Sequence, residues 1–287
     1  MKVQAPAKIN LALHVTGQRA DGYHLLDSLV TFTDFGDELT IEASEKDEFV
    51  IGGPFAGLLL GQEAGENLVI KARDALRVLA AGRPCPPVSI HLIKNLPIAS
   101  GLGGGSSDAA AALRGLNAHW GLALTDAQLI AAGLALGADV PMCLAGKPLR
   151  ATGIGEEITL LDAFPALDLV LVNPGAGVST PAIFKTLVKK DNRPMSSKAN
   201  LASFHAACEF LSAQHNDLQR PAIALEPVIA DCLAALQDNG AMLARMSGSG
   251  ATCFGIFTNA AIAALAAKGI AAGHQGWWAV ATKSVAA

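Results

Sequence analysis

The sequence predicts an α+β protein with two domains, and three observations lead to this prediction. The chain has 287 residues, which is enough for two domains with hydrophobic cores. Hydrophobic residues make up 51% of it and charged residues 16%, as in folded rather than disordered proteins. Strand patterns with interspersed helices dominate the first half and helix patterns the second, and the composition shifts over residues 146–155. We therefore expect one domain over residues 1–150 and another over residues 151–287.

The first predicted strand covers residues 7–15, where apolar residues alternate with others. Lys8 and Asn10 share one of its faces, opposite Ile9 and Leu11. A lysine on a strand most often marks a solvated edge, and this stretch alone favours that interpretation. The other elements expected in the first half are strands at 28–34, 38–43, 48–51 and 88–92 and helices at 67–81, 106–119 and 125–137.

Capping signals mark several helix ends. Gly82 follows the helix at 67–81 as a C-terminal glycine, and Thr125 with Gln128 makes a capping box. Thr180 and Pro181 resemble an N-cap and first-turn proline that start a short helix. The remaining elements expected in the second half are helices at about 200–214, 226–238 and 259–268 and strands at 167–173, 241–246, 252–257 and 277–283.

A glycine-rich stretch separates the strand at 88–92 from an alanine-rich helix. It reads Pro97, Ile98, Ala99, Ser100, Gly101, Leu102, Gly103, Gly104, Gly105, Ser106, Ser107 and Asp108. Glycine lets a ligand approach the backbone, and the first N–H groups of the following helix are unpaired at the positive end of its dipole. These features suit a bound phosphate. A flexible linker is the alternative, but linkers rarely lie so tightly between a strand and a helix.

Three familiar phosphate-binding loops are excluded by their spelling. No lysine follows the glycines, as a P-loop requires. A dinucleotide fingerprint starting at Gly101 needs a glycine where Ser106 stands, and one starting at Gly248 needs a glycine where Cys253 stands. The protein-kinase set is incomplete, because the sequence has a DFG triplet at residues 34–36 but no HRD triplet. The sequence thus indicates a phosphate site of a different kind.

Phosphoryl transfer needs anchored phosphates, cations and a positioned acceptor hydroxyl. Backbone N–H groups of residues 103–107 would surround the phosphates, and Ser106 or Ser107 would reach a magnesium ion or a phosphate oxygen. Asp139 is the candidate base. It follows a helix end and lies among apolar neighbours, where burying a charged carboxylate costs free energy and therefore suggests a function. An aspartate that caps a helix or pairs with a cation explains this pattern equally well.

Charge and cysteine usage exclude several other classes. The net charge of −4 provides no basic field for nucleic acid. The five cysteines form no CxxC pair and the seven histidines no HxxH or HExxH pattern, which favours free thiols over disulfides or zinc. No signal peptide or membrane-spanning run is recognisable. We expect a cytoplasmic protein that binds neither nucleic acid nor membranes.

Three motifs in order along the chain resemble those of the GHMP kinases, which include galactokinase, homoserine kinase, mevalonate kinase and phosphomevalonate kinase. They lie at residues 5–11, 97–110 and 247–252, so that the resemblance covers nearly the whole chain. It implies an N-terminal α/β domain similar to a small-subunit ribosomal protein, a ferredoxin-like C-terminal domain, and an active site in the cleft between them. ATP and Mg²⁺ are the implied cofactors.

Narrower features at residues 6–11 with 17–24, 101–108 and 137–141 resemble one branch of this family. Its members transfer the γ-phosphate of ATP to the 2-hydroxyl of a cytidine diphosphate ester of methylerythritol, in the non-mevalonate route to isoprenoids. The resemblance implies that Asp139 is the base and that Lys8 polarises the hydroxyl. It also places Asn10, Tyr23, His24, Thr180 and Phe184 at the cytidyl substrate, Asn67 and Lys94 at the nucleotide, and Ser247, Gly248, Ser249 and Gly250 in the third motif.

Two residues depart from the family pattern: Ser100 replaces a glycine or alanine, and Val30 stands where some members carry an aromatic residue near the substrate. Two alternative functions stay open. One is another small-molecule GHMP kinase, acting on mevalonate-type or homoserine substrates, in which a base-stacking Tyr23 would have no purpose. The other is a nucleotide-binding protein without catalysis, which would not need Lys8 and Asp139 together.

Overall fold

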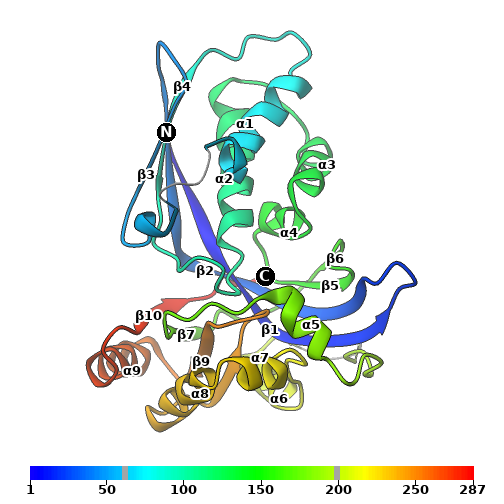
Figure 1. The fold of residues 1–287 in the computed structure, drawn as a ribbon, viewed down its shortest axis with the longest axis vertical. Coiled ribbons are helices and arrows are strands. Elements are labelled where there is room, and N and C mark those ends of the chain that lie inside the picture. The colour runs from blue at the N-terminus through cyan, green and yellow to red at the C-terminus, as the bar shows by residue number, and fades with distance from the viewer. Residues whose placement is uncertain (60–63, 197–200) are drawn as a thin grey trace. The chain divides into compact units, whose positions relative to one another are not determined.

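The structure of the chain, a computed structural model, describes residues 1–59, 64–196 and 201–287. Helices and strands occur in both halves of the chain (Figure 1), which confirms the predicted α+β class. The described residues form two compact units that interleave along the sequence. The first unit comprises Met1–Ala7, Gly36–Ile98 and Gly103–Gly146, and the second comprises Lys8–Phe35, Ala99–Leu102 and Lys147–Ala287.

Two long strands, β1 (Lys2–Gln18) and β2 (His24–Ala43), contribute to both units. They have 17 and 20 residues, against about 5–6 in an average strand. Each is long enough to serve two cores, so the units interleave instead of dividing linearly at residue 150 as expected. β2 also replaces the two separate strands expected at 28–34 and 38–43. A Cβ at Gly36 would lie 2.1 Å from the Ala5 carbonyl oxygen, so this glycine permits a close backbone approach without ending the strand.

The first unit packs helices against the C-terminal half of β2. There β4 (Val88–Ile93) pairs antiparallel with β2, and β3 (Glu48–Gly52) pairs parallel with β4. The helices are α1 (Leu68–Leu79), α2 (Gly104–His119), α3 (Asp126–Leu136) and α4 (Val140–Ala145). Figure 1 shows them on one side of β2, β3 and β4. Ala109, Ala110, Ala111 and Ala112 are fully buried in α2, since their small side chains allow close packing.

Helix boundaries in the first unit follow the predicted capping signals at α3 but not at the end of α1. There the helix ends at Leu79 with Ala80 as its C-cap, and Ala81, with φ +51°, takes the left-handed position that was predicted for Gly82. Thr125 and Gln128 make the predicted capping box at the start of α3, which ends before Gly137. Asn67 caps α1, because its Oδ1 accepts the Val69 N–H at 2.9 Å. The short helix α4 was not predicted.

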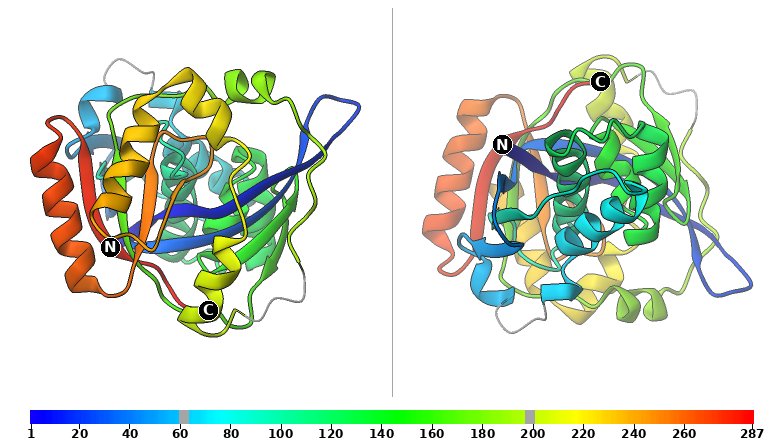
Figure 2. Two further views of the ribbon diagram at one scale, coloured as in Figure 1. Left: turned by 90° about the horizontal axis from the view of Figure 1, so that it is seen from below. Right: turned by 90° about the horizontal axis from the view of Figure 1, so that it is seen from above.

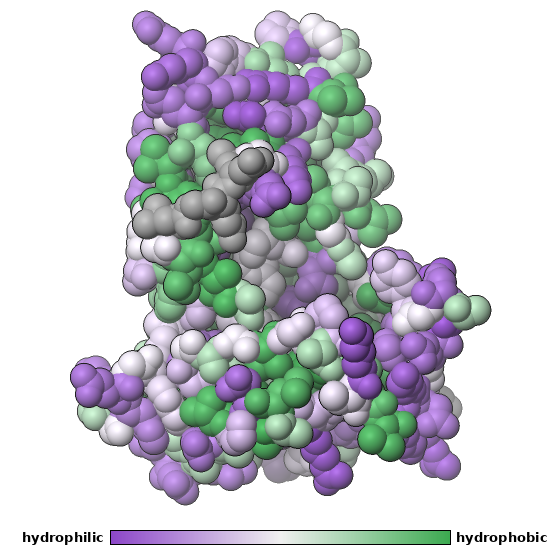
Figure 3. Space-filling model, viewed as in Figure 1, coloured by the Kyte–Doolittle hydropathy of each residue, from purple (hydrophilic) through white to green (hydrophobic). Residues whose placement is uncertain are grey.

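The surface of α3 carries exposed hydrophobic side chains. Figure 3 shows hydrophobic residues in green over α3, where Ile130 and Leu134 are exposed.

The second unit contains an antiparallel sheet in the order β10 (Trp278–Lys283), β7 (Asp168–Asn173), β9 (Cys253–Phe257) and β8 (Leu243–Met246). Helices α8 (Val228–Asp238) and α9 (Ala260–Gly273) share its core, with Val170, Ile229 and Ile270 buried together. Figure 2 shows α9 alongside β10 in both views. The helix expected at 259–268 extends to Gly273 and is longer than predicted. The strands expected at 167–173, 252–257 and 277–283 are confirmed within a few residues.

Further elements of this unit lie near the N-terminal half of β2. β5 (Leu149–Gly153) pairs antiparallel with it and β6 (Glu157–Leu160) with β5. The helices are α5 (Thr180–Thr186), α6 (Phe204–Ser212) and α7 (Gln219–Leu225). β5, β6 and α7 were not predicted. The helix expected at 200–214 begins at Phe204, and its expected first residue, position 200, lies outside the described residues.

The predicted start of α5 is wrong by one residue. Ser179, not Thr180, is the N-cap, and its Oγ accepts the Ala182 N–H at 3.4 Å. Thr180 is the first helical residue and its hydroxyl is free to interact elsewhere, as described below. No helix in the described ranges is long and apolar enough to cross a lipid bilayer.

Candidate active site

Strand β1 buries Lys8 and Asn10 on one face in the second unit. Each side chain is 5% exposed, so the solvated-edge interpretation of Lys8 is wrong. The Lys8 ammonium donates to Asn10 Oδ1 at 2.9 Å, and the Lys8 backbone N–H donates to the Leu102 carbonyl at 2.8 Å. Burying a charged lysine requires partners that satisfy it, and one of them is the carboxamide two residues along the strand.

The third motif meets part of the glycine-rich stretch in the same unit. Ser247 Oγ accepts the Asn10 backbone N–H at 3.1 Å and donates to the Gly101 carbonyl at 3.0 Å. Gly101 has φ +79°, and a Cβ there would lie 2.2 Å from the Ser247 carbonyl oxygen. Glycine is therefore required at this contact. The structure thus joins three predicted site segments, at Asn10, Gly101 and Ser247.

A cavity of about 520 Å³ in the second unit contains the predicted substrate residues Tyr23, His24, Thr180 and Phe184. The His24 and Phe184 rings stack with centroids 4.6 Å apart and planes 21° apart. Tyr23 is 60% exposed, so its ring is accessible to a ligand. The remaining lining residues are Gln18, Asp21, Gly22, Leu26, Ile154, Pro181, Lys185 and Lys190. Aromatic faces around a cavity of this size suit a planar base.

The imidazole of His24 is arranged to bind a polar group. Its Nε2 is buried and has no hydrogen-bond partner among the described residues. Burial lowers the pKa of His24, and the nearby Lys190 lowers it further, so the ring is neutral at physiological pH. A neutral imidazole offers one donor and one acceptor. Thr180 Oγ1 lies 2.7 Å from Ser249 Oγ, which connects this cavity to the third motif.

Val30, which departs from the family pattern, is fully buried in β2 opposite Leu149.

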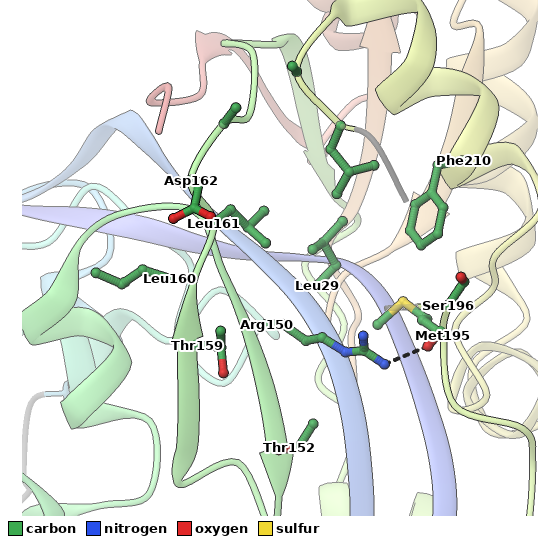
Figure 4. A pocket seen from close by; sticks show the side chains of 13 residues that line it. Leu29, Arg150, Thr152, Thr159, Leu160, Leu161, Asp162, Met195, Ser196 and Phe210 are labelled. Carbon is green, nitrogen blue, oxygen red and sulfur yellow. Dashed lines mark hydrogen bonds between the residues drawn. The ribbon is translucent and has the colours of Figure 1, made fainter. Parts of the chain in front are cut away.

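A second cavity of the same unit, of about 570 Å³, is lined by different residues. Figure 4 shows Arg150, Met195 and Phe210 around it. Arg150 forms two 2.7 Å hydrogen bonds with the Asp27 carboxylate and donates to the Met195 carbonyl. Among its described lining residues there is none of the predicted site residues.

In the first unit, the glycine-rich stretch leads into α2 with an open N-terminus. Gly103 occupies the N-cap position with φ +64° and makes no side-chain cap. The N–H groups of the first turn therefore remain available to an anion. Ser107 is 2% exposed and its hydroxyl donates to the Pro6 carbonyl at 2.7 Å. Of the two serines proposed for a metal ion, Ser106 is thus the better placed, since it is only half-buried.

Lys94 lies in a buried ion cluster beside this turn. Its ammonium donates to Asp37 and, at 2.7 Å, to Asp108, and Lys94 is 4% exposed. Asp37 Oδ1 also accepts the backbone N–H groups of Asn95 and Leu96. Burial lowers the pKa of Lys94, but Asp108 and Asp37 outweigh it and the net pKa is raised. This geometry favours a role for Lys94 in supporting the loop, and its predicted contact with the nucleotide stays a prediction.

Asp108 is a buried member of this cluster, with one oxygen left unsatisfied by the described residues. Burial raises its pKa to about 8, although Lys94 opposes the shift. Its second oxygen, Oδ1, is buried without a hydrogen-bond partner among the described residues. The raised pKa of Asp108 favours its protonated form, because burial disfavours the charged carboxylate and the neighbouring Asp37 repels it.

Asp139 immediately precedes α4 in the first unit and is half-buried. Its side chain makes no capping hydrogen bond to the helix, so the helix-capping alternative is wrong. Asn67 likewise belongs to this unit, where its carboxamide oxygen caps α1. Gly105 lies near the same helix end, because a Cβ there would be 3.7 Å from Leu68. The starts of α1 and α2 therefore lie together.

Sequence reasoning missed three residues that support the site. Asp37 belongs to the Lys94 cluster, and Ser28 accepts a hydrogen bond from the Asn10 carboxamide at 2.7 Å. Asn216 donates to the Met246 and Gly248 carbonyls, both at 2.8 Å, and so supports the third motif. Asn216 had a local signal, since its Oδ1 accepts the N–H two residues ahead in a typical Asx turn. Ser28 and Asp37 had none.

Comparison with protein families agrees with this geometry. The family model for the GHMP kinases N terminal domain matches residues 67–147, and that for GHMP kinases C terminal matches residues 197–274. The chain is 52% identical to the 4-diphosphocytidyl-2-C-methyl-D-erythritol kinase of Sinorhizobium medicae, covering 99% of this chain and 95% of that protein. It is 54% identical to the enzyme of the same name from Rhizobium meliloti, covering 98% and 94%.

Solved structures give the same result. A crystal structure of 4-(cytidine 5'-diphospho)-2C-methyl-D-erythritol kinase superposes with a TM-score of 0.83 at 33% identity, covering 99% of each chain. Homoserine kinase from Cytophaga hutchinsonii superposes with a TM-score of 0.71 at 21% identity, covering 99% of this chain and 94% of that chain, which shows a shared fold. The chain therefore belongs to the GHMP kinases, in the family of the 4-diphosphocytidyl-2-C-methyl-D-erythritol kinases.

Proposed function

We propose that this protein phosphorylates the 2-hydroxyl of 4-diphosphocytidyl-2-C-methyl-D-erythritol with ATP, and that Lys8 and Asp139 carry the reaction. The products are the 2-phosphate and ADP, in the non-mevalonate pathway to isoprenoid precursors. Relatives that share about half of its sequence over their full length bear the name of this kinase. The observation that carries the proposal is the cavity of about 520 Å³ with an accessible tyrosine, a stacked phenylalanine and an unpartnered histidine nitrogen.

We assign the cytidine base to this cavity. The Tyr23 ring, which is accessible, and the Phe184 ring provide faces for stacking on the pyrimidine. His24 Nε2 would then meet the polar edge of the base, which satisfies a buried atom that has no partner among the described residues. Lys185 and Lys190 give the cavity positive charge suited to the diphosphate of the substrate.

The ATP phosphates are assigned to the glycine-rich stretch and the start of α2. Unpaired N–H groups and the helix dipole favour negative charge there. We assign Mg²⁺ to the same place, as a partner of the ATP phosphates. Magnesium commonly binds through substrate phosphates with few protein ligands. Ser106 would hold it, and the ion supplies charge neutralisation on the phosphates when bound.

For the chemical step, Asp139 accepts the proton of the 2-hydroxyl as the oxygen attacks the γ-phosphorus. The Lys8 ammonium offsets negative charge on the reacting oxygens, and its fixed position avoids reorganisation during the reaction. Asn10 keeps the ammonium in place. Because both substrates are charged nucleotides that do not cross membranes unaided, we propose that the enzyme works in the cytoplasm.

Incubating the purified protein with ATP, Mg²⁺ and each of three acceptors tests this function. We expect ADP release with the cytidyl substrate and none above background with mevalonate or homoserine. Turnover of mevalonate or homoserine instead would assign the chain to another GHMP activity. Binding of ATP without turnover of any acceptor would favour a nucleotide-binding protein without catalysis.

A further inference from the structure

A row of hydrogen bonds starts at the Lys8 ammonium and ends at the backbone of β1 in the second unit. Lys8 Nζ donates to Asn10 Oδ1 at 2.9 Å, and Asn10 Nδ2 donates to Ser28 Oγ at 2.7 Å. Ser28 Oγ in turn donates to the Ala12 carbonyl at 2.7 Å. Ser28, on β2, is 3% exposed, so water does not compete for its hydroxyl. The row connects the proposed cation to a residue 20 positions away (28 − 8).

The direction of this row is determined at both ends. The Ala12 carbonyl only accepts, so the single hydroxyl proton of Ser28 must point to it. Ser28 Oγ is then left as an acceptor and must meet the amino group of Asn10, not its oxygen. At the other end, the Lys8 ammonium only donates and must meet an acceptor. Both ends therefore require the same orientation of the Asn10 carboxamide.

A carboxamide is nearly symmetric in shape, so packing alone does not choose between its two orientations. The reversed orientation would direct an amino group at the Lys8 ammonium. The hydrogen bond from the Asn10 backbone N–H to Ser247 holds the main chain but does not select the side-chain orientation. Among the described contacts of Asn10, those with Lys8 and Ser28 both select this orientation, and the contact with Ser28 does so independently of the ammonium.

We infer that Ser28 is a positioning residue for the kinase reaction, because its hydroxyl orients the Asn10 carboxamide with the oxygen toward Lys8. The inference rests on the proposed role of Lys8. Ser28 acts through Asn10 and touches neither ATP nor the reacting atoms in this scheme. Its loss leaves a buried amino group without its acceptor and displaces the Lys8 ammonium from the position that the reaction needs.

Steady-state kinetics of Ser28→Ala, Ser28→Cys and Ser28→Thr test the inference. In Ser28→Ala we expect kcat to fall by about 10- to 100-fold, as for a small misplacement of a catalytic group, with the KM for ATP unchanged. Ser28→Cys replaces the hydroxyl oxygen with a larger sulfur that is only a weak acceptor, so its kcat falls in the same direction. Ser28→Thr keeps the hydroxyl and restores kcat to near the wild-type value.

Ser284→Ala is the matched control. Ser284 is also 3% exposed in the second unit, and its Oγ accepts the Leu167 N–H at 2.9 Å, away from Lys8. Its loss removes a buried hydroxyl and lowers the Tm with kcat unchanged. A purely structural role for Ser28 would make Ser28→Ala behave like this control.

The outcomes separate this inference from the proposed function. If Lys8→Met abolishes turnover while folded Ser28→Ala or Ser28→Cys keeps the wild-type kcat, the positioning role is overturned and the role of Lys8 stands. Failure of Ser28→Thr to restore kcat would also overturn the positioning role. If Lys8→Met retains turnover, the proposed role of Lys8 is wrong and the inference falls with it. Loss of kcat in the alanine and cysteine variants with recovery in the threonine variant supports both.

Discussion

The start of α2 and the cavity at Tyr23 are the two nucleotide sites that we propose, and they are built in different ways. The start of α2 presents backbone N–H groups from one short stretch, with Gly103 at the N-cap position. The cavity uses side chains, and it brings Tyr23 together with Phe184, which lies 161 positions further along the chain (184 − 23). Backbone donors recognise any phosphate, whereas ring faces and an imidazole edge distinguish one base from another. The comparison separates general binding of ATP from selection of the acceptor.

The largest effect is expected from a residue that belongs to neither region. Asp139→Asn removes the proposed base and keeps the size of the side chain. We expect kcat to fall by about 10²–10⁴-fold, because a neutral amide does not accept the hydroxyl proton. Single-turnover assays with equilibrium titration of ADP measure both properties. ADP affinity should be unchanged, and near-wild-type turnover would remove Asp139 from the mechanism.

A smaller effect is expected from the base cavity. Phe184→Ala removes a ring face next to His24, and we expect weaker binding of the cytidyl substrate by about 1–3 kcal/mol with the KM for ATP unchanged. Phe210→Ala is the control, because this phenylalanine lines the other cavity of the second unit (Figure 4). A rise of the substrate KM in both variants would point to general loosening and not to base stacking.

The two serines at the start of α2 allow a finer distinction. Ser107→Ala removes the hydrogen bond to the Pro6 carbonyl and should lower the free energy of unfolding by about 1 kcal/mol, with little effect on the Mg²⁺ requirement. Ser106→Ala should instead raise the Mg²⁺ concentration needed for half-maximal activity, with little change in stability. Titration of Mg²⁺ beside thermal unfolding of both variants distinguishes them, and the reverse result would exchange their assigned roles.

The cluster beside this turn predicts a pH dependence of stability. The pKa of Asp108 is raised to about 8 in the folded protein, against about 3.9 for an unperturbed aspartate. Between these values the folded state binds more protons than the unfolded state, so this group makes stability fall as the pH rises toward 8. Asp108→Asn imitates the protonated carboxyl and should reduce the decrease in Tm between pH 5 and pH 8. An unchanged pH dependence in the variant would exclude Asp108 as its source.

The same contrast explains what was predictable from sequence. The glycine-rich stretch and the Thr125 capping box are local, since neighbouring residues contain both the signal and the structure. The base cavity was predicted only through resemblance to a family, because no local pattern shows that Tyr23 and Phe184 meet. Ser28 went unnoticed for the same reason, since its contact with Asn10 depends on how β1 and β2 pair.

Elements that were too short or too long also escaped prediction. α4 has six residues, which is fewer than two helical turns and too few to show a repeating hydrophobic pattern. β2 continues through Gly36, a residue that ordinarily indicates a break in a strand. The close approach to Ala5 explains that glycine, but only the pairing of the strands reveals it. Interleaved units follow from the same long strands.

Calorimetric titration of Tyr23→Ala with CDP and with ADP tests the central claim most directly, because each nucleotide reports on one of the two regions. We expect the variant to bind CDP more weakly than the wild type by about 1–3 kcal/mol, and to bind ADP with unchanged affinity. Unchanged CDP affinity, or an equal loss for both nucleotides, would contradict the separation of base selection from ATP binding.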